Sequence, residues 1–426
     1  MATAPRRNID LASARAEAEH RFIAANPKSR VLFDQAAEAL PGGNTRTVLY
    51  YAPFPLTLAR GEGARVWDVD GHAYADFLCE YTAGLYGHSH PVIMAALREA
   101  LDGGIVLGGH NKAEGRFAAA LCARFPSLDL VRFCNSGTEA NLMAISTARA
   151  VTGRDKIMVF DGAYHGGVFY YAHGGMPLNA PFPTVIAPYD DTQAALDLIA
   201  ANARDLAAIV VEPMQGAAGC IPASRDFLAA LREASAKHGI ILIFDEVMTS
   251  RLAPGGLQEA LGITPDMTTL GKYLGGGLTF GAFGGRAEIM KRFDPRDADA
   301  FPHAGTFNNN VLTMAAGLAG ITKVYTPEAA VALNARGDRL RERIAAVFDA
   351  HGTGVRVTGL GSMLGLHFAS EDARALFHLD LLDRGQYFAR RGMIILSLPM
   401  TDADLDGLVA AVEGFRADHA ALLAAG

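Results

Sequence analysis

The chain has 426 residues, half of them hydrophobic, which is enough for two or three domains with sizeable cores. Its 38 basic and 45 acidic residues give a net charge of −7, which argues against a protein that binds nucleic acid through a broad basic surface. No apolar run approaches the roughly 18 residues of a membrane span, and the polar start is unlike a secretory signal. The four cysteines are spaced too irregularly for a disulfide framework or a metal site, so we expect a cytoplasmic globular protein.

Residues 1–70 are expected to form an N-terminal segment that contributes to a small domain and to the substrate entry. Apolar residues recur three and four positions apart over residues 11–22, which predicts a helix that ends before Pro27. A glycine-rich turn follows at residues 41–44. Residues 65–71 then predict a strand that ends in an Asp-Gly turn.

Residues 71–314 are expected to form a large domain. Short apolar runs alternate here with helix-length segments, and the hydrophobicity of the runs is continuous rather than alternating. Such strands are buried on both faces, which predicts an α/β domain with a mostly parallel sheet covered by helices. The predicted strands are residues 130–134, 156–160, 207–211 and 240–244, with a further one between the glycines at 275–277 and 284–285, and the predicted helices are 139–152, 192–202 and 225–238.

Residues 315–426 are expected to form a smaller α/β domain. A long amphipathic segment that includes Leu333 and Leu340 precedes a strand-like run at residues 361–368. A charged helix, an apolar run and a terminal helix follow. Thr401 and Asp404 have the spacing of a capping box at the start of that last helix.

Polar motifs follow several of the predicted strands, which is where ligands bind in open α/β sheets. Ser136, Gly137 and Thr138 come directly after residues 130–134 and begin a helix, so their backbone N–H groups suit a phosphate. An ordinary helix N-cap would use the same residue types. Tyr164 lies in a glycine-flanked loop, where its ring can either stack on a planar heterocycle or cover the domain surface.

Two charged side chains at strand ends complete this pattern. Asp245 follows the most apolar strand, where an ionised carboxylate needs a cation such as a pyridinium nitrogen, unless it only caps the next helix. Lys272 lies between glycines after a short apolar stretch, where a desolvated amine suits Schiff-base chemistry, although most lysines are solvated surface charges. A phosphate cradle, a stacking ring, a carboxylate and an amine together meet the requirements of pyridoxal phosphate.

The chain resembles the class III, fold-type I pyridoxal-phosphate aminotransferases over nearly its whole length. The resemblance implies a large cofactor-binding domain with a mostly parallel sheet, and a smaller α/β domain. The segments that carry it are residues 61–64, 135–141, 164–166, 211–213, 244–249 and 269–272.

The resemblance also implies a role for each motif residue. Lys272 would form the Schiff base and then move the substrate proton, while Asp245 would keep the pyridine nitrogen protonated. Tyr164 and Val247 would pack on the two faces of the ring. Thr306 would reach the phosphate of the neighbouring subunit, which implies a homodimer. The remaining cofactor contacts would come from Ser136, Gly137, Thr138, Glu212 and Gln215.

Two branches of this family are most similar: aminotransferases of aromatic β-amino acids such as β-phenylalanine, and glutamate-1-semialdehyde aminomutase. Residues 44–54, 212–216 and 308–310 resemble the first branch, whereas residues 305–311 depart from the aminomutase pattern. We therefore expect ping-pong transfer of an amino group from a β-amino acid to an α-keto acid such as 2-oxoglutarate or pyruvate. The alternative is intramolecular amino transfer of the aminomutase kind.

The carboxylate of a β-amino acid lies one carbon farther from the amine than that of an α-amino acid, so the site needs a cation at an offset. Arg46 is a candidate for a bidentate contact, and Arg391 is a second candidate, unless it is a solvated charge beside Arg390. The aromatic residues that could wall an aryl pocket, or simply pack in a core or interface, are Tyr50, Tyr51, Phe54, Tyr81 and Tyr86.

A protein of another class could hold the same cofactor as a sensor or as a structural element, without catalysis. The presence of both Lys272 and Asp245, with an arginine and aromatic residues near the entry, argues against this reading. The expected partners are therefore small amino-acid and keto-acid substrates, with no metal, nucleic acid or membrane.

Overall fold

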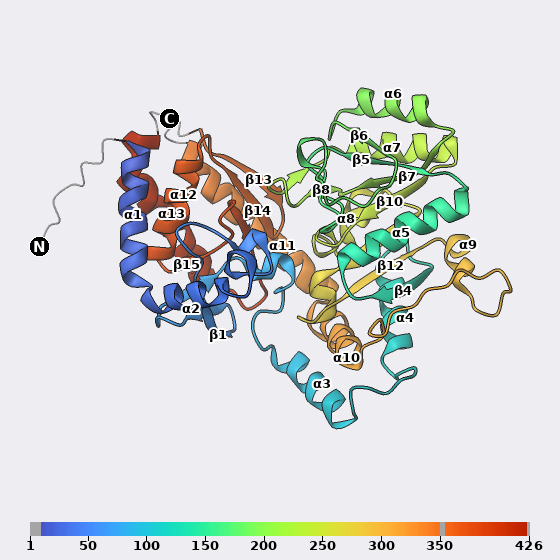
Figure 1. Ribbon diagram of the computed structural model, residues 1–426, viewed down its shortest axis with the longest axis horizontal. Coiled ribbons are helices and arrows are strands. Elements are labelled where there is room, and N and C mark those ends of the chain that lie inside the picture. Colours follow the sequence, from blue (N-terminus) through green and yellow to red (C-terminus); the bar gives the residue numbers. More distant parts are fainter. Residues whose placement is uncertain (1–9, 350–353, 424–426) are drawn as a thin grey trace, which may run out of the picture. The chain divides into compact units, whose positions relative to one another are not determined.

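The computed structural model describes residues 10–349 and 354–423, and the chain divides into two compact units (Figure 1). The larger unit comprises Thr82–Tyr86 and His90–Asn334. Among the described residues, the smaller unit comprises those up to Tyr81, Gly87–Ser89 and those from Ala335 onward. Both main boundaries fall later in the sequence than the expected positions after residues 70 and 314.

The larger unit is built on a seven-stranded sheet in the order β4-β12-β11-β10-β7-β5-β6. Only β12 runs antiparallel to its two neighbours, and the other pairings are parallel, which confirms the mostly parallel sheet predicted from the sequence. The strands are β4 (Leu130–Cys134), β5 (Lys156–Phe160), β6 (Thr184–Ala187), β7 (Leu206–Val211), β10 (Ile241–Asp245), β11 (Met267–Gly271) and β12 (Gly281–Gly285).

The continuous hydrophobicity of these strands follows from burial on both faces of the sheet. In β5, Ile157 and Val159 belong to one buried cluster, while Met158 and Phe160 belong to another. The first cluster is completed by residues of α5 (Gly137–Thr152). The second contains residues of α6 (Thr192–Asn202) and α7 (Arg225–His238). Because side chains alternate across a strand, helices cover both faces of the sheet.

The other elements of the larger unit are shorter. A two-stranded hairpin, β8 (Met214–Gln215) and β9 (Ile221–Pro222), follows β7. The remaining α-helices are α3 (Pro91–Asp102), α4 (Glu114–Arg124), α8 (Gly256–Leu261), α9 (Ala287–Met290) and α10 (Val311–Ala319).

The smaller unit contains two antiparallel-rich sheets, β1-β2-β3-β15 and β13-β14-β16. Their strands are β1 (Leu58–Glu62), β2 (Arg65–Asp68), β3 (Ala73–Asp76), β13 (Arg356–Leu360), β14 (Met363–His367), β15 (Gln386–Tyr387) and β16 (Met393–Ile395). The helices are α1 (Leu11–Ala25), α2 (Pro27–Ala37), α11 (Pro327–Asp349), which starts in the larger unit, α12 (Glu371–Asp383) and α13 (Asp402–Leu423).

Several predicted local signals are present. The first helix ends at Ala25, and Pro27 starts the next helix, where its missing N–H costs nothing. Before α13, the backbone N–H of Thr401 donates to Asp404 and the Asp404 N–H donates back to the Thr401 hydroxyl, as in a capping box. The predicted strand at residues 65–71 ends earlier, because the side chain of Asp68 accepts the Gly71 N–H and closes the turn.

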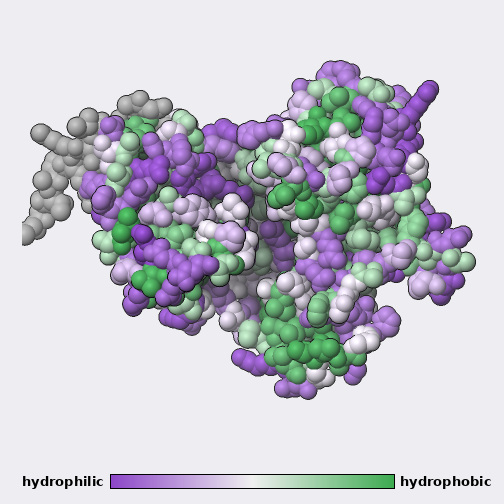
Figure 2. Space-filling model, in the orientation of Figure 1, coloured by the Kyte–Doolittle hydropathy of each residue, from purple (hydrophilic) through white to green (hydrophobic). Residues whose placement is uncertain are grey.

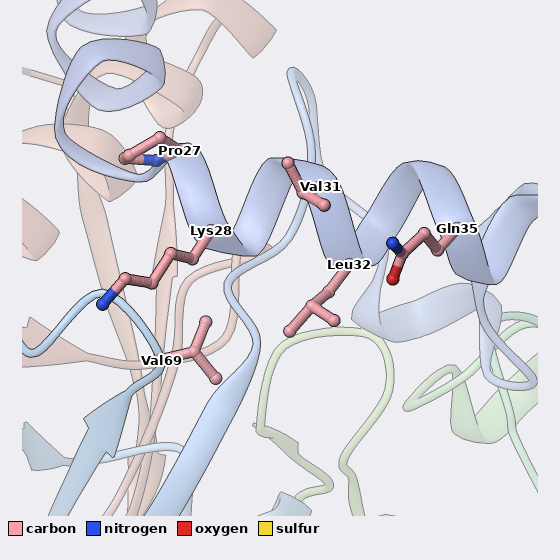
Figure 3. A pocket seen from close by; sticks show the side chains of 6 residues that line it. All are labelled: Pro27, Lys28, Val31, Leu32, Gln35 and Val69. Carbon is pink, nitrogen blue, oxygen red and sulfur yellow. The ribbon is translucent and has the colours of Figure 1, made fainter.

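A shallow groove runs beside α2, as Figure 3 shows. Five of its lining side chains come from α2 and the sixth, Val69, follows β2. None of the six is a predicted site residue. In the described part of the chain, no helix combines the length and apolarity needed to cross a membrane, and no group of three His, Cys, Asp or Glu side chains could hold a metal ion.

The core of the smaller unit contains a histidine in an apolar environment. His378 of α12 is 1% exposed, with its ring 4.7 Å from that of Tyr51 and 5.3 Å from that of Phe388. Neither ring nitrogen has a hydrogen-bond partner among the described residues. Burial, helped by the charge of Arg390, lowers the pKa of His378 from 6.5 to about 3.

His378 is therefore expected to make stability depend on pH. Above about pH 6.5 the imidazole is neutral in both states, but as the pH falls toward 3 only the unfolded chain takes up the proton, so stability is lost. When the pH is lowered from 8 to about 5.5, the free energy of unfolding should decrease by about 1.4 kcal/mol less in His378→Leu than in the wild type. Denaturant titrations at both pH values measure this, with the exposed His20→Leu as control. Equal losses in wild type and His378→Leu would contradict the assignment.

Candidate active site

The predicted motifs meet at one edge of the large sheet. Strands β5, β7, β10 and β11 are mutually parallel, and β4 has the same direction because β12 runs antiparallel to both β4 and β11. Their carboxyl ends therefore lie at the same edge, which is the usual ligand-binding edge of such sheets. The segments that leave this edge contain the cofactor residues predicted on the larger unit, except Thr306.

The segment after β4 forms a tight helix start. Ser136 is the N-cap of α5, and its hydroxyl accepts the Glu139 N–H at 3.1 Å. Thr138 accepts the Gly167 N–H at 3.2 Å, so the loop after β5 lies directly on this helix start. Gly166 has φ +125°, and a Cβ there would lie 2.2 Å from the Thr138 hydroxyl, so only glycine permits this approach. Ser136 thus acts as the N-cap, and the first backbone N–H groups of α5 can still bind an anion.

Val247 joins three of the motifs. A Cβ on Gly137 would lie 2.9 Å from the Val247 methyl groups, and a Cβ on Gly271 would lie 3.1 Å from one of them. The helix start, the segment after β10 and the residue before Lys272 therefore pack against the same side chain.

Lys272 is held in an uncommon backbone conformation. It follows β11 directly and begins a short 3₁₀-helix, Lys272–Gly275. Its φ of +56° lies in the left-handed region, which costs conformational energy for a non-glycine residue. Such strain is concentrated at functional sites, which fits the predicted role of this amine.

Asp245 lies at the end of β10 with 4% of its surface exposed. One carboxylate oxygen accepts hydrogen bonds from Asn141 and from His165 Nδ1, both at 2.8 Å. The other oxygen accepts the Val247 N–H at 3.0 Å. Burial lowers the pKa of His165, but its hydrogen bond to Asp245 and the negative charge there raise it overall. The buried carboxylate of Asp245 thus has hydrogen-bond partners for both of its oxygens.

Glu212 and Gln215 organise the loop that contains Tyr164. The two oxygens of Glu212 accept the N–H groups of Tyr164, at 3.0 Å, and of Gly216, at 3.1 Å. Burial, with a further contribution from the charge of Asp245, raises the pKa of Glu212 to about 7. Gln215 donates to the carbonyl of Asp161 at 2.8 Å. Both side chains therefore contact the protein backbone beside the site.

Two other predicted contacts lie at more exposed positions. Tyr164 is 43% exposed, and its ring lies 5.6 Å from that of Tyr170, so the residue retains a surface for stacking. Thr306 is exposed on a loop whose Asn308 accepts a hydrogen bond from Asn135 at 3.0 Å. This loop thus lies beside the end of β4.

Arg46 and Arg391 both belong to the smaller unit and approach the same ring. Their guanidinium carbons lie 5.7 Å and 4.9 Å from the centre of the Tyr81 ring. Arg46 also forms an ion pair with Glu80. Arg391 lines a cavity together with Tyr50 and other residues of the segment that follows Arg46.

The five aromatic candidates for an aryl pocket fall into two groups. Phe54 is fully buried, with its ring 5.1 Å from that of Phe22, and Tyr86 is 4% exposed. These two side chains are core residues of their respective units. Tyr50 and Tyr51 line the cavity beside Arg391, and Tyr81 lies under both arginines.

The network around Asp245 contains three residues for which the sequence motifs predicted no role, namely Asn141, His165 and Thr269. Asn141 donates to Asp245 and to the carbonyl of His165, and it accepts the Thr269 hydroxyl at 2.8 Å. All three lie within motifs that the sequence analysis singled out. Two features of the sequence could have indicated two of them. Asn141 places an amide on the buried face of α5 shortly after the N-cap, and His165 is the residue next to Tyr164.

A family model, a relative in sequence and a solved structure all indicate the same family for this chain. The aminotransferase class-III family model matches residues 49–413. The β-phenylalanine transaminase of Variovorax paradoxus is 53% identical over 421 residues, which covers 96% of this chain and 97% of the relative. A crystal structure of a β-phenylalanine aminotransferase from the same organism matches with a TM-score of 0.95 and 52% identity, over 97% of this chain and 99% of that one.

A second kind of relative is more distant. A glutamate-1-semialdehyde 2,1-aminomutase from Sorangium cellulosum is 37% identical, over 90% of this chain and 95% of the relative. The family match spans most of the chain, including the end of β4, Asp245 and Lys272. This chain belongs to the class III aminotransferases.

Proposed function

We propose that the protein transfers the amino group of an aromatic β-amino acid, of the β-phenylalanine type, to an α-keto acid such as 2-oxoglutarate or pyruvate. The observation that carries this proposal is the 53% identity, over nearly the full length of both chains, with a β-phenylalanine transaminase. The arrangement of Lys272 and Asp245 at the ends of neighbouring strands supports the aminotransferase chemistry.

The cofactor of this reaction is proposed to be pyridoxal phosphate, and the residues present fit it. The start of α5, at Ser136, Gly137 and Thr138, offers N–H groups and hydroxyls for the phosphate. Asp245, hydrogen-bonded to His165, would face a protonated ring nitrogen. Tyr164 has an exposed ring for stacking, and Val247 packs between Gly137 and Gly271.

Pyridoxal phosphate supplies an aldehyde for the amine and a ring that accepts the electron pair released from the substrate carbon. Lys272 would take the proton from the amine-bearing carbon and return it on the cofactor side, since its amine is freed when substrate binds. Asp245 would hold the positive charge of the ring nitrogen in place. Glu212 and Gln215 would fix the loop that presents Tyr164.

Arg46 and Arg391 are proposed to bind the substrate carboxylate. The guanidinium group suits this role because it donates two parallel hydrogen bonds to a carboxylate. The cavity lined by Arg391, Tyr50 and Tyr51 has both cationic and aromatic walls, which matches a substrate that has a carboxylate and an aryl group.

The protein is further proposed to act as a homodimer. Figure 2 shows an apolar area over α3 of the larger unit. In the sequence at the end of α3 and just after it, Leu101, Ile105, Val106 and Leu107 are exposed, Val106 by 85%. Exposed apolar clusters of this kind mark protein interfaces. Phe307 is 61% exposed beside Thr306, so an interface that includes this loop would bring Thr306 to the phosphate site of the second subunit.

With β-phenylalanine and 2-oxoglutarate or pyruvate, the purified enzyme is expected to form glutamate or alanine in equal amount to the keto acid consumed. Omitting the keto acid should stop turnover after one equivalent, because the amino group has no acceptor. Chromatography of the amino acids measures this result. Turnover of glutamate-1-semialdehyde without any keto acid, together with no reaction of β-phenylalanine, would instead establish the aminomutase activity.

A further inference from the structure

Residues 79–82 form a left-handed turn without any glycine. The φ angles of Cys79, Glu80, Tyr81 and Thr82 are +45°, +47°, +51° and +81°. Each such residue costs conformational free energy, and a run of them is rare. A conformation of this kind persists only where surrounding contacts impose it, and it is concentrated at functional sites.

The contacts that impose the turn are well defined. One oxygen of Asp76 accepts the N–H groups of Leu78 and Cys79, at 2.9 and 3.0 Å. The other oxygen is hydrogen-bonded to His88 Nε2 at 2.9 Å. The Cys79 thiol also donates to the carbonyl of Ile395 at 3.3 Å. The end of β3 and the strand β16 thus hold the turn in place.

The turn presents Tyr81 to two cations from distant parts of the sequence. The guanidinium carbon of Arg391 is 4.9 Å from the ring centre and that of Arg46 is 5.7 Å from it, both within the range of a cation–π contact. The Tyr81 hydroxyl donates to the carbonyl of Val48 at 3.0 Å, which fixes the segment that follows Arg46. Burial raises the pKa of Tyr81, so the phenol is neutral and attracts the cations through its ring.

The cationic groups around the Tyr81 ring differ in whether they have an anionic partner. Arg46 is paired with Glu80. In contrast, Nε of Arg391 is buried without a hydrogen-bond partner among the described residues. Its neighbour Arg390 already pairs with Glu371. Of the two guanidinium groups at the ring, Arg46 therefore has a carboxylate partner, whereas Nε of Arg391 has none among the described residues.

We propose that Tyr81 is a positioning residue that holds Arg46 and Arg391 on one ring as a single binding site for the substrate carboxylate. This inference rests on the proposed function and names the side chain that sets its carboxylate specificity. The left-handed turn is the means by which Tyr81 reaches both arginines, because a right-handed backbone at residues 79–82 would direct the ring elsewhere.

The test compares donors with and without a carboxylate. The ratio of kcat/KM for β-phenylalanine to that for 1-phenylethylamine is expected to fall at least tenfold in Tyr81→Leu, through KM of β-phenylalanine. Tyr81→Phe keeps the ring and should retain the ratio within about threefold. Trp67→Leu is the matched control, because it removes another cation–π contact of the same unit, with Arg60 at 3.4 Å.

Direct binding gives a readout that does not depend on turnover. The dissociation constant of 3-phenylpropanoate, measured by calorimetry on the holoenzyme, should rise at least tenfold in Tyr81→Leu and less than threefold in Tyr81→Phe and Trp67→Leu. Tyr81→Met replaces Tyr81→Leu if the latter does not fold. Equal affinities in wild type and the ring-deleted variant, or a Tyr81→Phe as weak as Tyr81→Leu, would overturn the inference.

The same data separate the inference from the proposed function. A wild type that does not react with β-phenylalanine but binds 3-phenylpropanoate in a Tyr81-dependent manner would reject the substrate and support the role of Tyr81. If the wild type reacts with β-phenylalanine, and the ratio of kcat/KM for the two amines is the same in the wild type and in all variants, the result would support the substrate and overturn the role of Tyr81.

Discussion

Replacing Lys272 with alanine is expected to lower kcat at least about 1,000-fold, while the protein stays folded. The substitution removes the amine that would bind the cofactor covalently and move the substrate proton, and a positioned proton-transfer group alone contributes about 100- to 10,000-fold. The strained backbone at Lys272, with φ +56°, should tolerate alanine no worse than lysine, so melting should change little.

Single-turnover and steady-state rates with β-phenylalanine measure this effect. Lys291→Ala serves as the matched control, because Lys291 is an exposed lysine of the same unit outside the site. A Lys272→Ala enzyme with kcat within tenfold of the wild type would remove Lys272 from the proposed chemistry.

Asp245→Asn is expected to lower kcat about 100- to 1,000-fold. The amide nearly preserves the shape of the carboxylate but loses the negative charge that would balance the protonated ring nitrogen. The cofactor then accepts electrons less readily. The same change removes the carboxylate that raises the pKa of His165, so that burial should then lower the pKa of this imidazole.

The control for this variant is Asp266→Asn, which alters another buried aspartate of the same sheet. Asp266 precedes β11 and so lies at the sheet edge opposite to Asp245, where it accepts the Leu242 N–H and pairs with Arg232. Asp266→Asn should mainly lower the free energy of unfolding and change kcat little, whereas Asp245→Asn should mainly lower kcat. Equal losses of kcat in the two variants would show that charge at Asp245 has no special role.

Much of the large unit could be predicted from local sequence. Strands β4 and β5 and helices α6 and α7 have the predicted bounds residue for residue. Both strands are short, mainly apolar runs, and a capping residue precedes each of the two helices. The predicted cofactor residues, other than the loop residue Thr306, lie at one sheet edge for the same reason: each follows a strand end.

What local sequence could not predict depends on contacts between distant segments. The network of Asn141, His165 and Thr269 around Asp245 joins three different motifs, and no single motif shows it. Likewise, the left-handed turn before Tyr81 contains no glycine to mark it, and its shape is imposed by Asp76. Pattern and propensity describe single elements, whereas these features arise only after the elements have packed.

The most direct test of the central claim is one half-reaction followed by visible absorption. The yellow holoenzyme is mixed with racemic β-phenylalanine in the absence of any keto acid. We predict that the absorbance of the bound aldehyde form falls stoichiometrically, and that adding 2-oxoglutarate or pyruvate restores it. An unchanged spectrum, in a protein whose Lys272 can still be trapped on the cofactor with borohydride, would contradict a β-amino-acid aminotransferase.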